Sequence, residues 1–208
     1  YQDWNDLQLG FVEGGNFGYT KNAGTASSQG VEVEMFIQPT DNLNFVFGVT
    51  YTKAEIEDNV LKVDGVPEAG LAAVKGNSIP FVPELSANAA VKYSYQVSDT
   101  LEGIVRLGYV YRSESYSDPQ NSTGPIPVAG SLVSPNLEND PSNMVDLRLG
   151  VESEDWNVYL YATNLLGEDA TLSRGANGTN ATPDGVTSYS TATRVKPRTI
   201  GVEFTLDF

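Results

Sequence analysis

The stretch Thr199-Ile200-Gly201-Val202-Glu203-Phe204-Thr205-Leu206-Asp207-Phe208 alternates polar and apolar side chains as far as its final aromatic residue. Alternation with a period of two residues predicts a β-strand that has one apolar face and one polar face. The end of a chain frays unless a sheet holds it, so this segment predicts a larger sheet in which it is the closing strand. Its apolar face comprises Ile200, Val202, Phe204, Leu206 and Phe208.

The same alternation recurs along the rest of the chain, and no segment of helical period competes with it. The sequence therefore predicts an all-β protein of about eight antiparallel strands in up-and-down order. The other expected strands are residues 1–12, 30–38, 43–52, 84–97, 101–113, 144–152 and 156–164.

Charged residues of these strands share one face. From the second expected strand to the last, the charged residues stand at the positions that alternate with the apolar ones, and so lie on the other face of each strand. They are Glu32, Glu34, Glu84, Lys92, Glu102, Arg106, Arg112, Asp146, Arg148, Glu152, Glu203 and Asp207. A transmembrane barrel with a polar lumen has this pattern, and so does a soluble β-sandwich. Parity alone therefore leaves both architectures open.

The connections between the strands separate the two architectures. Three connections are tight turns, at residues 39–42, 98–100 and 153–155, and they alternate with long polar segments at 53–83, 114–143 and 165–196. An up-and-down order then places every tight turn at one end of the sheet and every long loop at the other. Short turns on one side and long loops on the other are typical of outer-membrane barrels, so the pattern favours a transmembrane antiparallel β-barrel.

The composition excludes several functions. The chain has 27 acidic and 12 basic residues, a net charge of −15, so nucleic acid is not an expected partner. Histidine and cysteine are absent, which removes serine triads with a histidine base, thiol nucleophiles and the commonest zinc ligands. We expect no catalytic, cofactor-binding or metal-binding residues, and the chain is not expected to be an enzyme.

Four short motifs carry a family resemblance. They are residues 22–34, NAGTASSQGVEVE; 79–84, IPFVPE; 161–168, YATNLLGE; and 196–201, KPRTIG. In this order and spacing they resemble the late barrel strands of TonB-dependent outer-membrane receptors. The final strand, which ends on Phe208, also resembles the assembly signal of bacterial outer-membrane β-barrels.

The resemblance implies a barrel of 22 strands filled by a plug. Residues 1–208 would form its C-terminal third, and the plug domain is expected to lie outside this sequence. The first nine residues already resemble the middle of a strand, so we expect the chain to be a fragment of a longer protein. The implied location is the bacterial outer membrane, and the implied partners are lipid, the barrel assembly machinery and, through the missing plug, the TonB energy-transducing complex.

The implied function is import of a bulky nutrient, either a ferric siderophore or an oligosaccharide. Two alternatives remain open. The first is a self-contained eight-stranded outer-membrane barrel with a structural or adhesive role, and the second is a soluble carbohydrate-binding sandwich.

Candidate contacts to the ligand lie in the long loops. Phe17, Tyr19, Tyr116 and Tyr189 could stack on sugar rings or pack loop against loop. Segment 114–143 has four carboxylates and no Lys or Arg, which favours a neutral or cationic ligand over a polyanion.

The charged strand residues allow two interpretations. Three arginines, Arg106, Arg112 and Arg148, share the polar face with Glu102, Asp146 and Glu152. We expect a cross-strand ladder of opposite charges that stiffens the sheet, and the alternative is a path for a charged ligand.

Overall fold

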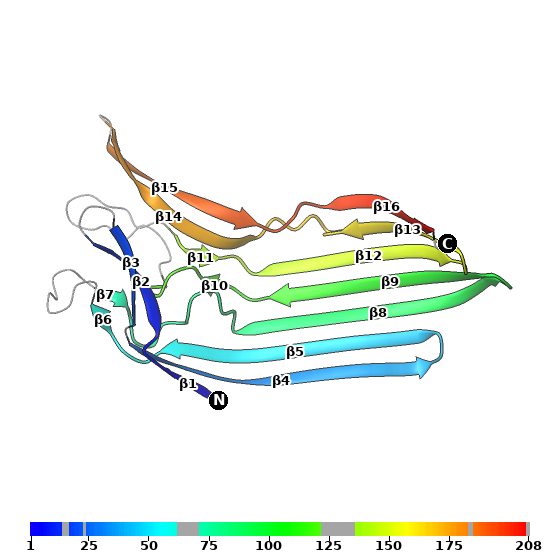
Figure 1. The fold of residues 1–208 in the computed structure, drawn as a ribbon, viewed down its shortest axis with the longest axis horizontal. Helices are drawn as coiled ribbons and strands as arrows, with labels where there is room; N and C mark the ends of the chain where they lie inside the picture. The colour runs from blue at the N-terminus through cyan, green and yellow to red at the C-terminus, as the bar shows by residue number, and fades with distance from the viewer. Residues whose placement is uncertain (14–16, 23, 62–70, 122–135, 183–184, 207–208) are drawn as a thin grey trace.

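A computed structural model describes residues 1–13, 17–22, 24–61, 71–121, 136–182 and 185–206. Its largest element is an eight-stranded antiparallel sheet whose strands lie side by side in the order β1-β4-β5-β8-β9-β12-β13-β16 (Figure 1). The strands are β1 Gln2–Asn5, β4 Thr25–Thr40, β5 Leu43–Ile56, β8 Leu85–Ser98, β9 Leu101–Arg112, β12 Ser142–Glu152, β13 Trp156–Thr163 and β16 Thr199–Leu206. Within the described ranges, no helix has the length and hydrophobicity that a membrane-spanning helix requires.

Four small hairpins complete the fold, and all of them lie at one end of the sheet, called here the loop end (Figure 1). The pairs are β2 Gln8–Glu13 with β3 Phe17–Asn22, β6 Val60–Leu61 with β7 Leu71–Ala73, β10 Ser115–Tyr116 with β11 Glu138–Asn139, and β14 Thr171–Thr182 with β15 Gly185–Arg194. The opposite end carries the three tight turns, at the predicted positions, and is called the turn end.

The all-β prediction is confirmed, but the first expected strand is wrong. Residues 1–12 do not form one strand, because the chain turns at Asp6, whose φ is +60°. Aspartate tolerates this left-handed conformation better than most residues. Beyond the turn, the amide of Leu7 donates to the carbonyl of Gly24 at 3.0 Å, and the chain leaves the main sheet to form β2.

The long segments also differ from the expectation of plain polar loops. Each contains a strand pair, and β4 and β5 extend beyond the predicted limits to Thr25 and Ile56. Backbone amides and carbonyls need hydrogen-bond partners wherever they are shielded from water, and pairing within each long connection supplies them. The loop end is therefore structured over its described residues.

The described sheet is open. Strands β1 and β16 occupy its two edges, and no described residue of one pairs with the other. The alternative of a self-contained eight-stranded barrel requires that pairing, so this structure does not support it.

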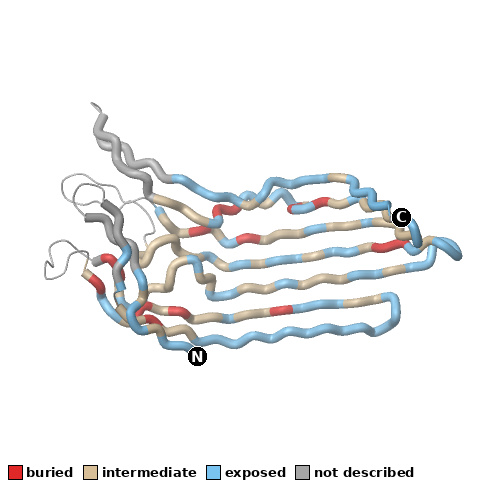
Figure 2. Tube along the Cα trace, viewed as in Figure 1, coloured by how far each residue is buried: buried red, intermediate tan, exposed pale blue. Residues whose placement is uncertain are grey.

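A small apolar core lies at the loop end. Ile56, which is 1% exposed, packs with Val60, Ala72 and Ala73, and Leu7 contacts this cluster from the turn after β1. Figure 2 shows that buried residues gather mainly at the loop end, whereas exposed residues run along most of the long strands. The long strands therefore have little covering of their own.

Asn164 fixes the end of β13. It is fully buried with a φ of +50°, its side-chain nitrogen donates to the carbonyls of Glu168 and Lys196 at 2.8 and 2.9 Å, and its side-chain oxygen accepts from the Glu168 amide at 2.7 Å. The Asn164 amide itself donates to Asp146 Oδ1 at 2.9 Å. One side chain thus connects the end of β13 to the start of β16.

We expect Asn164→Ala to lower the free energy of unfolding by roughly 2–3 kcal/mol, because it removes three hydrogen bonds and strains a left-handed residue. The midpoint of denaturant unfolding measures this loss. Asn157→Ala is the matched control, since no side-chain hydrogen bond of Asn157 is found in the described structure. Equal shifts for the two variants would contradict the role assigned to Asn164.

Candidate functional site on the charged face and at the loop end

The apolar face of the sheet has no cover. Val31, Val202 and Phe204 are 66%, 70% and 63% exposed, and similar exposure continues on β5, β8, β9 and β13. A soluble monomer rarely exposes a contiguous apolar patch larger than a few hundred Å². The apolar face therefore requires apolar surroundings.

The opposite, charged face has three cations in one cross-strand row. Lys92 of β8 pairs with Arg106 of β9, and Arg106 pairs with Arg148 of β12. We call these three residues the cation row. Like charges directly opposite each other are destabilising in a sheet, so the row is unfavourable as an arrangement of neighbours.

The expected ladder of opposite charges is therefore wrong. Glu102 lies opposite Glu152, and Arg112 lies between Ser86 and Ser142. The residues are on the predicted face, but the register between β9 and β12 brings like charges together. Parity decides the face of a residue, whereas the register between strands decides its neighbour.

Arg148 is held in a defined position. Its guanidinium lies 3.8 Å from the centroid of the Tyr159 ring and donates to the Glu203 carboxylate at 2.7 and 3.3 Å. The Tyr159 ring passes over Gly150, where any Cβ atom would collide with it. Tyr159 in turn donates its hydroxyl to Glu152. A cation that reaches over a ring to a carboxylate is partly neutralised, so Arg148 is the compensated member of the cation row.

Beside this cluster the charged face is hollowed by about 470 Å³. The hollow is lined by Arg106, Gly108, Asp146, Arg148 and Tyr161, among others. A Cβ atom at Gly108 would meet nothing within 4 Å, which explains the depression at the centre of the sheet. The hollow has room for a group that approaches the cation row from above the face.

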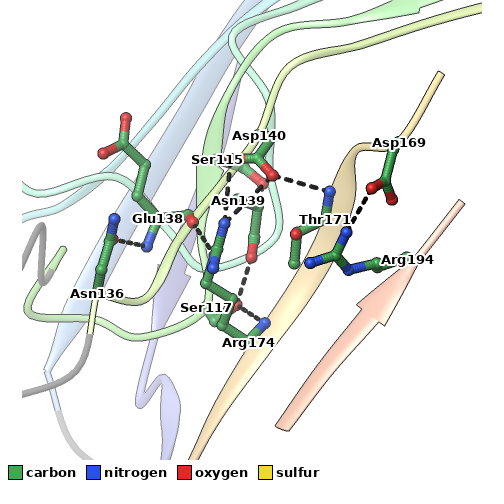
Figure 3. A network of polar contacts seen from close by, with 10 residues as sticks. All are labelled: Ser115, Ser117, Asn136, Glu138, Asn139, Asp140, Asp169, Thr171, Arg174 and Arg194. Carbon is green, nitrogen blue, oxygen red and sulfur yellow. Dashed lines mark hydrogen bonds and ion pairs between the residues drawn. The ribbon is translucent and has the colours of Figure 1, made fainter. Parts of the chain in front are cut away.

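A second cluster of polar contacts joins two hairpins at the loop end (Figure 3). Arg174 of β14 donates to both oxygens of Asp140 at 3.1 and 3.2 Å, and its Nε donates to the carbonyl of Glu138 at 2.7 Å. Asp140 also accepts from the Thr171 amide at 2.9 Å. Strand β14 is thereby fastened to β11.

Ser117 and Asn139 extend this cluster. The Ser117 hydroxyl accepts from the Arg174 amide at 2.9 Å and donates to Asn139 Oδ1 at 2.8 Å. Asn139 is 2% exposed and donates to the Ser115 hydroxyl at 3.1 Å. These contacts join the hairpin of β10 and β11 to β14, so the cluster connects two hairpins (Figure 3).

Electrostatics supports this assignment. The pKa of Asp140 is lowered, first by the hydrogen bond from the Thr171 backbone amide and then by its side chain and by Arg174. Hydrogen bonds to a carboxylate and a nearby guanidinium both favour the ionised form. Asp140 of segment 114–143 is therefore paired with a cation of segment 165–196. Within that second segment, Arg194 forms an ion pair with Asp169 at 2.6 Å.

The candidate ligand contacts are distributed over three hairpins. Tyr116 lies in β10, is half-buried and pairs with Glu138, and burial followed by that carboxylate raises its pKa. Phe17 and Tyr19 lie in β3, and Tyr189 lies in β15, but the side chains of these three residues are outside the described structure. A shared ligand site for the four aromatic residues stays a prediction.

The closing strand has the predicted faces. Ile200, Val202, Phe204 and Leu206 all lie exposed on the apolar face of β16, whereas Phe208 is outside the described residues. Their role as an assembly signal stays a prediction. The described residues contain no group of three or more side chains that could hold a metal ion.

Sequence reasoning missed both the cation row and the Asp140–Arg174 pair. The sequence did contain a signal for the Lys92–Arg106 pair. Both residues are seven positions from Asp99, which lies in the tight turn between their strands, so a hairpin places them opposite each other. No such signal existed for Arg148 or Arg174, which join their partners across long connections.

Comparison with known proteins gives one family. A family model described as TonB dependent receptor-like, beta-barrel matches residues 1–165. This match covers most of the chain and includes seven of the eight strands in the large sheet, from β1 to β13.

Solved structures share the fold. The ferric yersiniabactin uptake receptor FyuA from Yersinia pestis has a TM-score of 0.65 at 20% identity, over 91% of this chain and 25% of that one. The siderophore receptor PiuA from Acinetobacter baumannii has a TM-score of 0.61 at 17% identity, over 97% of this chain and 24% of that one. The ferric-catecholate import receptor Fiu from E. coli K12 has a TM-score of 0.58 at 17% identity, over 97% of this chain and 23% of that one. The chain thus spans about a quarter of the length of these proteins.

The Asp140 fastening predicts a pH-dependent loop end. The pKa of Asp140 is lowered in the folded protein, so its stabilisation is complete above the unfolded value of about 3.9 and is lost as the pH falls through the folded pKa. Hydrogen exchange of the Thr171 amide, corrected for the intrinsic rate, should speed up only at such low pH. In Asp140→Asn it should already be fast at neutral pH.

Glu138→Gln is the control, because the Glu138 carboxylate has no hydrogen bond or ion pair in the part of the chain that the structure describes. Its exchange profile should match that of the unmodified protein. A flat profile in the unmodified protein would show that Asp140 does not fasten β14.

Proposed function

The chain belongs to the family of TonB-dependent receptor-like β-barrels, and from this membership we propose that it forms part of the wall of a receptor that imports a bulky nutrient. The family is one of transport receptors in the bacterial outer membrane, so the soluble sandwich is set aside. The observation that carries the proposal is the uncovered apolar face on a sheet that the family model matches. In an outer-membrane barrel such an apolar face contacts lipid.

The rest of the assembly is inferred. On this proposal residues 1–208 contribute about eight strands to a barrel of roughly 22, and a plug from elsewhere in the parent protein fills the lumen and contacts the TonB complex. The charged face then lines the lumen, the loop end is extracellular and β16 presents the assembly signal. A quarter share of the solved relatives' length is consistent with this division.

We propose a ferric siderophore as the cargo class. Three solved structures with this fold are a ferric yersiniabactin, a siderophore and a ferric-catecholate receptor, which supports iron chelates over oligosaccharides. The acidic loop segment is weaker evidence for a neutral ligand than its composition indicated, because Arg174 compensates Asp140. The loop end therefore gives no strong reason against an anionic chelate.

Deleting the gene of the parent protein should abolish uptake of radioactive iron from at least one ferric siderophore while uptake of other chelates continues. Complementation with the intact gene should restore it. Growth on oligosaccharides as sole carbon source is the parallel assay. Loss of growth on an oligosaccharide, with iron uptake unchanged, would replace the proposed cargo class.

The lipid-facing side can be tested with neighbouring residues of equal exposure. Phe47 lies on the apolar face and Val46 on the charged face, at 43% and 44% exposed. Phe47→Arg should cost roughly 2–4 kcal/mol in the folding of the membrane-inserted receptor, because it places a charge near mid-bilayer. Val46→Arg should cost much less, since its face is expected to be polar.

Urea-dependent folding into lipid vesicles, followed by heat-modifiable migration in gels, measures both costs. Equal costs for the two variants would remove the case for a lipid-facing side.

A further inference from the structure

A second, smaller hollow lies at the loop end, where the charged face meets the hairpins. Its volume is about 130 Å³. Sites for whole small-molecule ligands usually measure roughly 300–1,000 Å³, so this hollow has room for a single small group. It has an apolar side and a polar side, and it is lined by Phe81, Pro83, Leu172, Arg112, Ser113, Ser115, Asn139, Asp140 and Ser142.

Most of the polar lining is already bound within the protein. The Ser113 hydroxyl accepts from the Leu85 amide at 3.1 Å, and the Ser115 hydroxyl accepts from Asn139 at 3.1 Å. The Asp140 carboxylate is held by Arg174 and by the Thr171 amide. These groups therefore shape the hollow but are not available to a ligand.

Arg112 and Ser142 differ from the rest of the lining. Ser142 is only 4% exposed, yet its hydroxyl has no hydrogen bond to a described residue. A polar side chain buried to this extent normally has a partner. Arg112 has no carboxylate within ion-pair distance in the described ranges. The two residues are direct neighbours across β9 and β12, so both can reach one bound group.

The apolar side of the hollow includes a residue in an unfavourable conformation. The Val82 amide donates to the Ile79 carbonyl at 3.4 Å and closes a turn that has Pro80 second and Phe81 third. Phe81 has a φ of +64°, which in such a turn favours Gly or Asn. Its amide donates to the Tyr116 carbonyl at 2.8 Å, which holds the turn in place.

Packing within the protein does not account for a phenylalanine in this turn. Phe81 is 58% exposed, so most of its side chain has no cover. Backbone strain that persists in a folded protein is concentrated at functional sites, including ligand clamps. A flat apolar group in the hollow would cover the Phe81 ring and also Leu172, which is 38% exposed.

We propose that this hollow binds a carboxylate carried on a flat apolar group such as an aromatic ring. The Arg112 guanidinium pairs with the carboxylate, the Ser142 hydroxyl donates to it, and the Phe81 ring packs against the apolar group. Asp140 does not oppose the anion, because Arg174 compensates it. The inference rests on the proposed function, in which this group is a peripheral part of the imported cargo.

The test uses para-fluorobenzoate as the probe and the purified parent receptor in detergent, without cargo. Broadening of the fluorine NMR signal, corrected for the effect of detergent alone, measures binding. Arg112→Gln should weaken binding about tenfold, and Ser142→Ala about threefold. The neutral para-fluorobenzamide should bind far more weakly than the acid. Absence of binding, or binding that neither variant changes, would overturn the proposal.

Matched variants separate the hollow from general effects. Ser86 is the neighbour of Arg112 on the other side and does not line the hollow, so Ser86→Ala should leave binding unchanged. Ser142→Ala removes a single hydroxyl without a partner, and it keeps the proposal falsifiable if Arg112→Gln fails to fold.

Phe81→Asn tests the ring, because asparagine tolerates the left-handed conformation but has no ring. It should weaken binding of the probe about threefold without lowering the melting temperature of the receptor. A lower melting temperature together with unchanged binding would contradict the role assigned to Phe81.

The carboxylate can come from the cargo or from a dissolved compound, and competition separates these sources. The ferric siderophore whose uptake is lost on deletion of the gene should displace the probe. Failure of that chelate to displace a bound probe would overturn the assignment to the cargo. The proposed function fails in a different way, since uptake of every chelate would then survive deletion while the probe would still bind.

Discussion

The structure depends on the register between its eight strands, each of which alternates apolar and polar side chains. Because side chains change face at every residue, a slip of one residue between two strands would turn all charges of one strand onto the apolar face. At one tight turn Ser98 pairs with Leu101, which places a polar residue opposite an apolar one. A register shift then brings Gln96 opposite Glu102, and the faces agree from there onward. A similar register shift separates the Thr40–Leu43 pair from the Ile37–Phe45 pair in β4 and β5. Such irregularities at the turn end keep the apolar and charged residues on separate faces.

The loop end is held together by different forces. The long strands have few buried residues along most of their length, whereas a small apolar core around Ile56 and two polar clusters, around Asn164 and Arg174, lie where the strands meet the loop-end segments. These contacts join segments that are distant in sequence. They give the described part of the loop end defined positions without a large hydrophobic core, because buried polar groups that are fully hydrogen-bonded also specify one arrangement.

The proposed function accounts for a sheet with two exposed faces. On that proposal the apolar face contacts lipid, and the charged face lines the interior of a barrel of which these strands are one part. The distribution of charge on the polar face is uneven, with cations near mid-strand and carboxylates near the turn end.

The sequence by itself determined the strands, their faces and their tight turns. These features are local: alternation, turn residues and chain parity need no knowledge of distant segments, as the confirmed faces of Ile200 and Val202 illustrate. Tertiary structure alone decided the break at Asp6, the hairpins inside the long connections and the partners of charged residues. Arg106 faces Arg148 and Arg174 reaches Asp140 because strands joined by long connections settle their register through many contacts at once. No pattern within one strand contains that information.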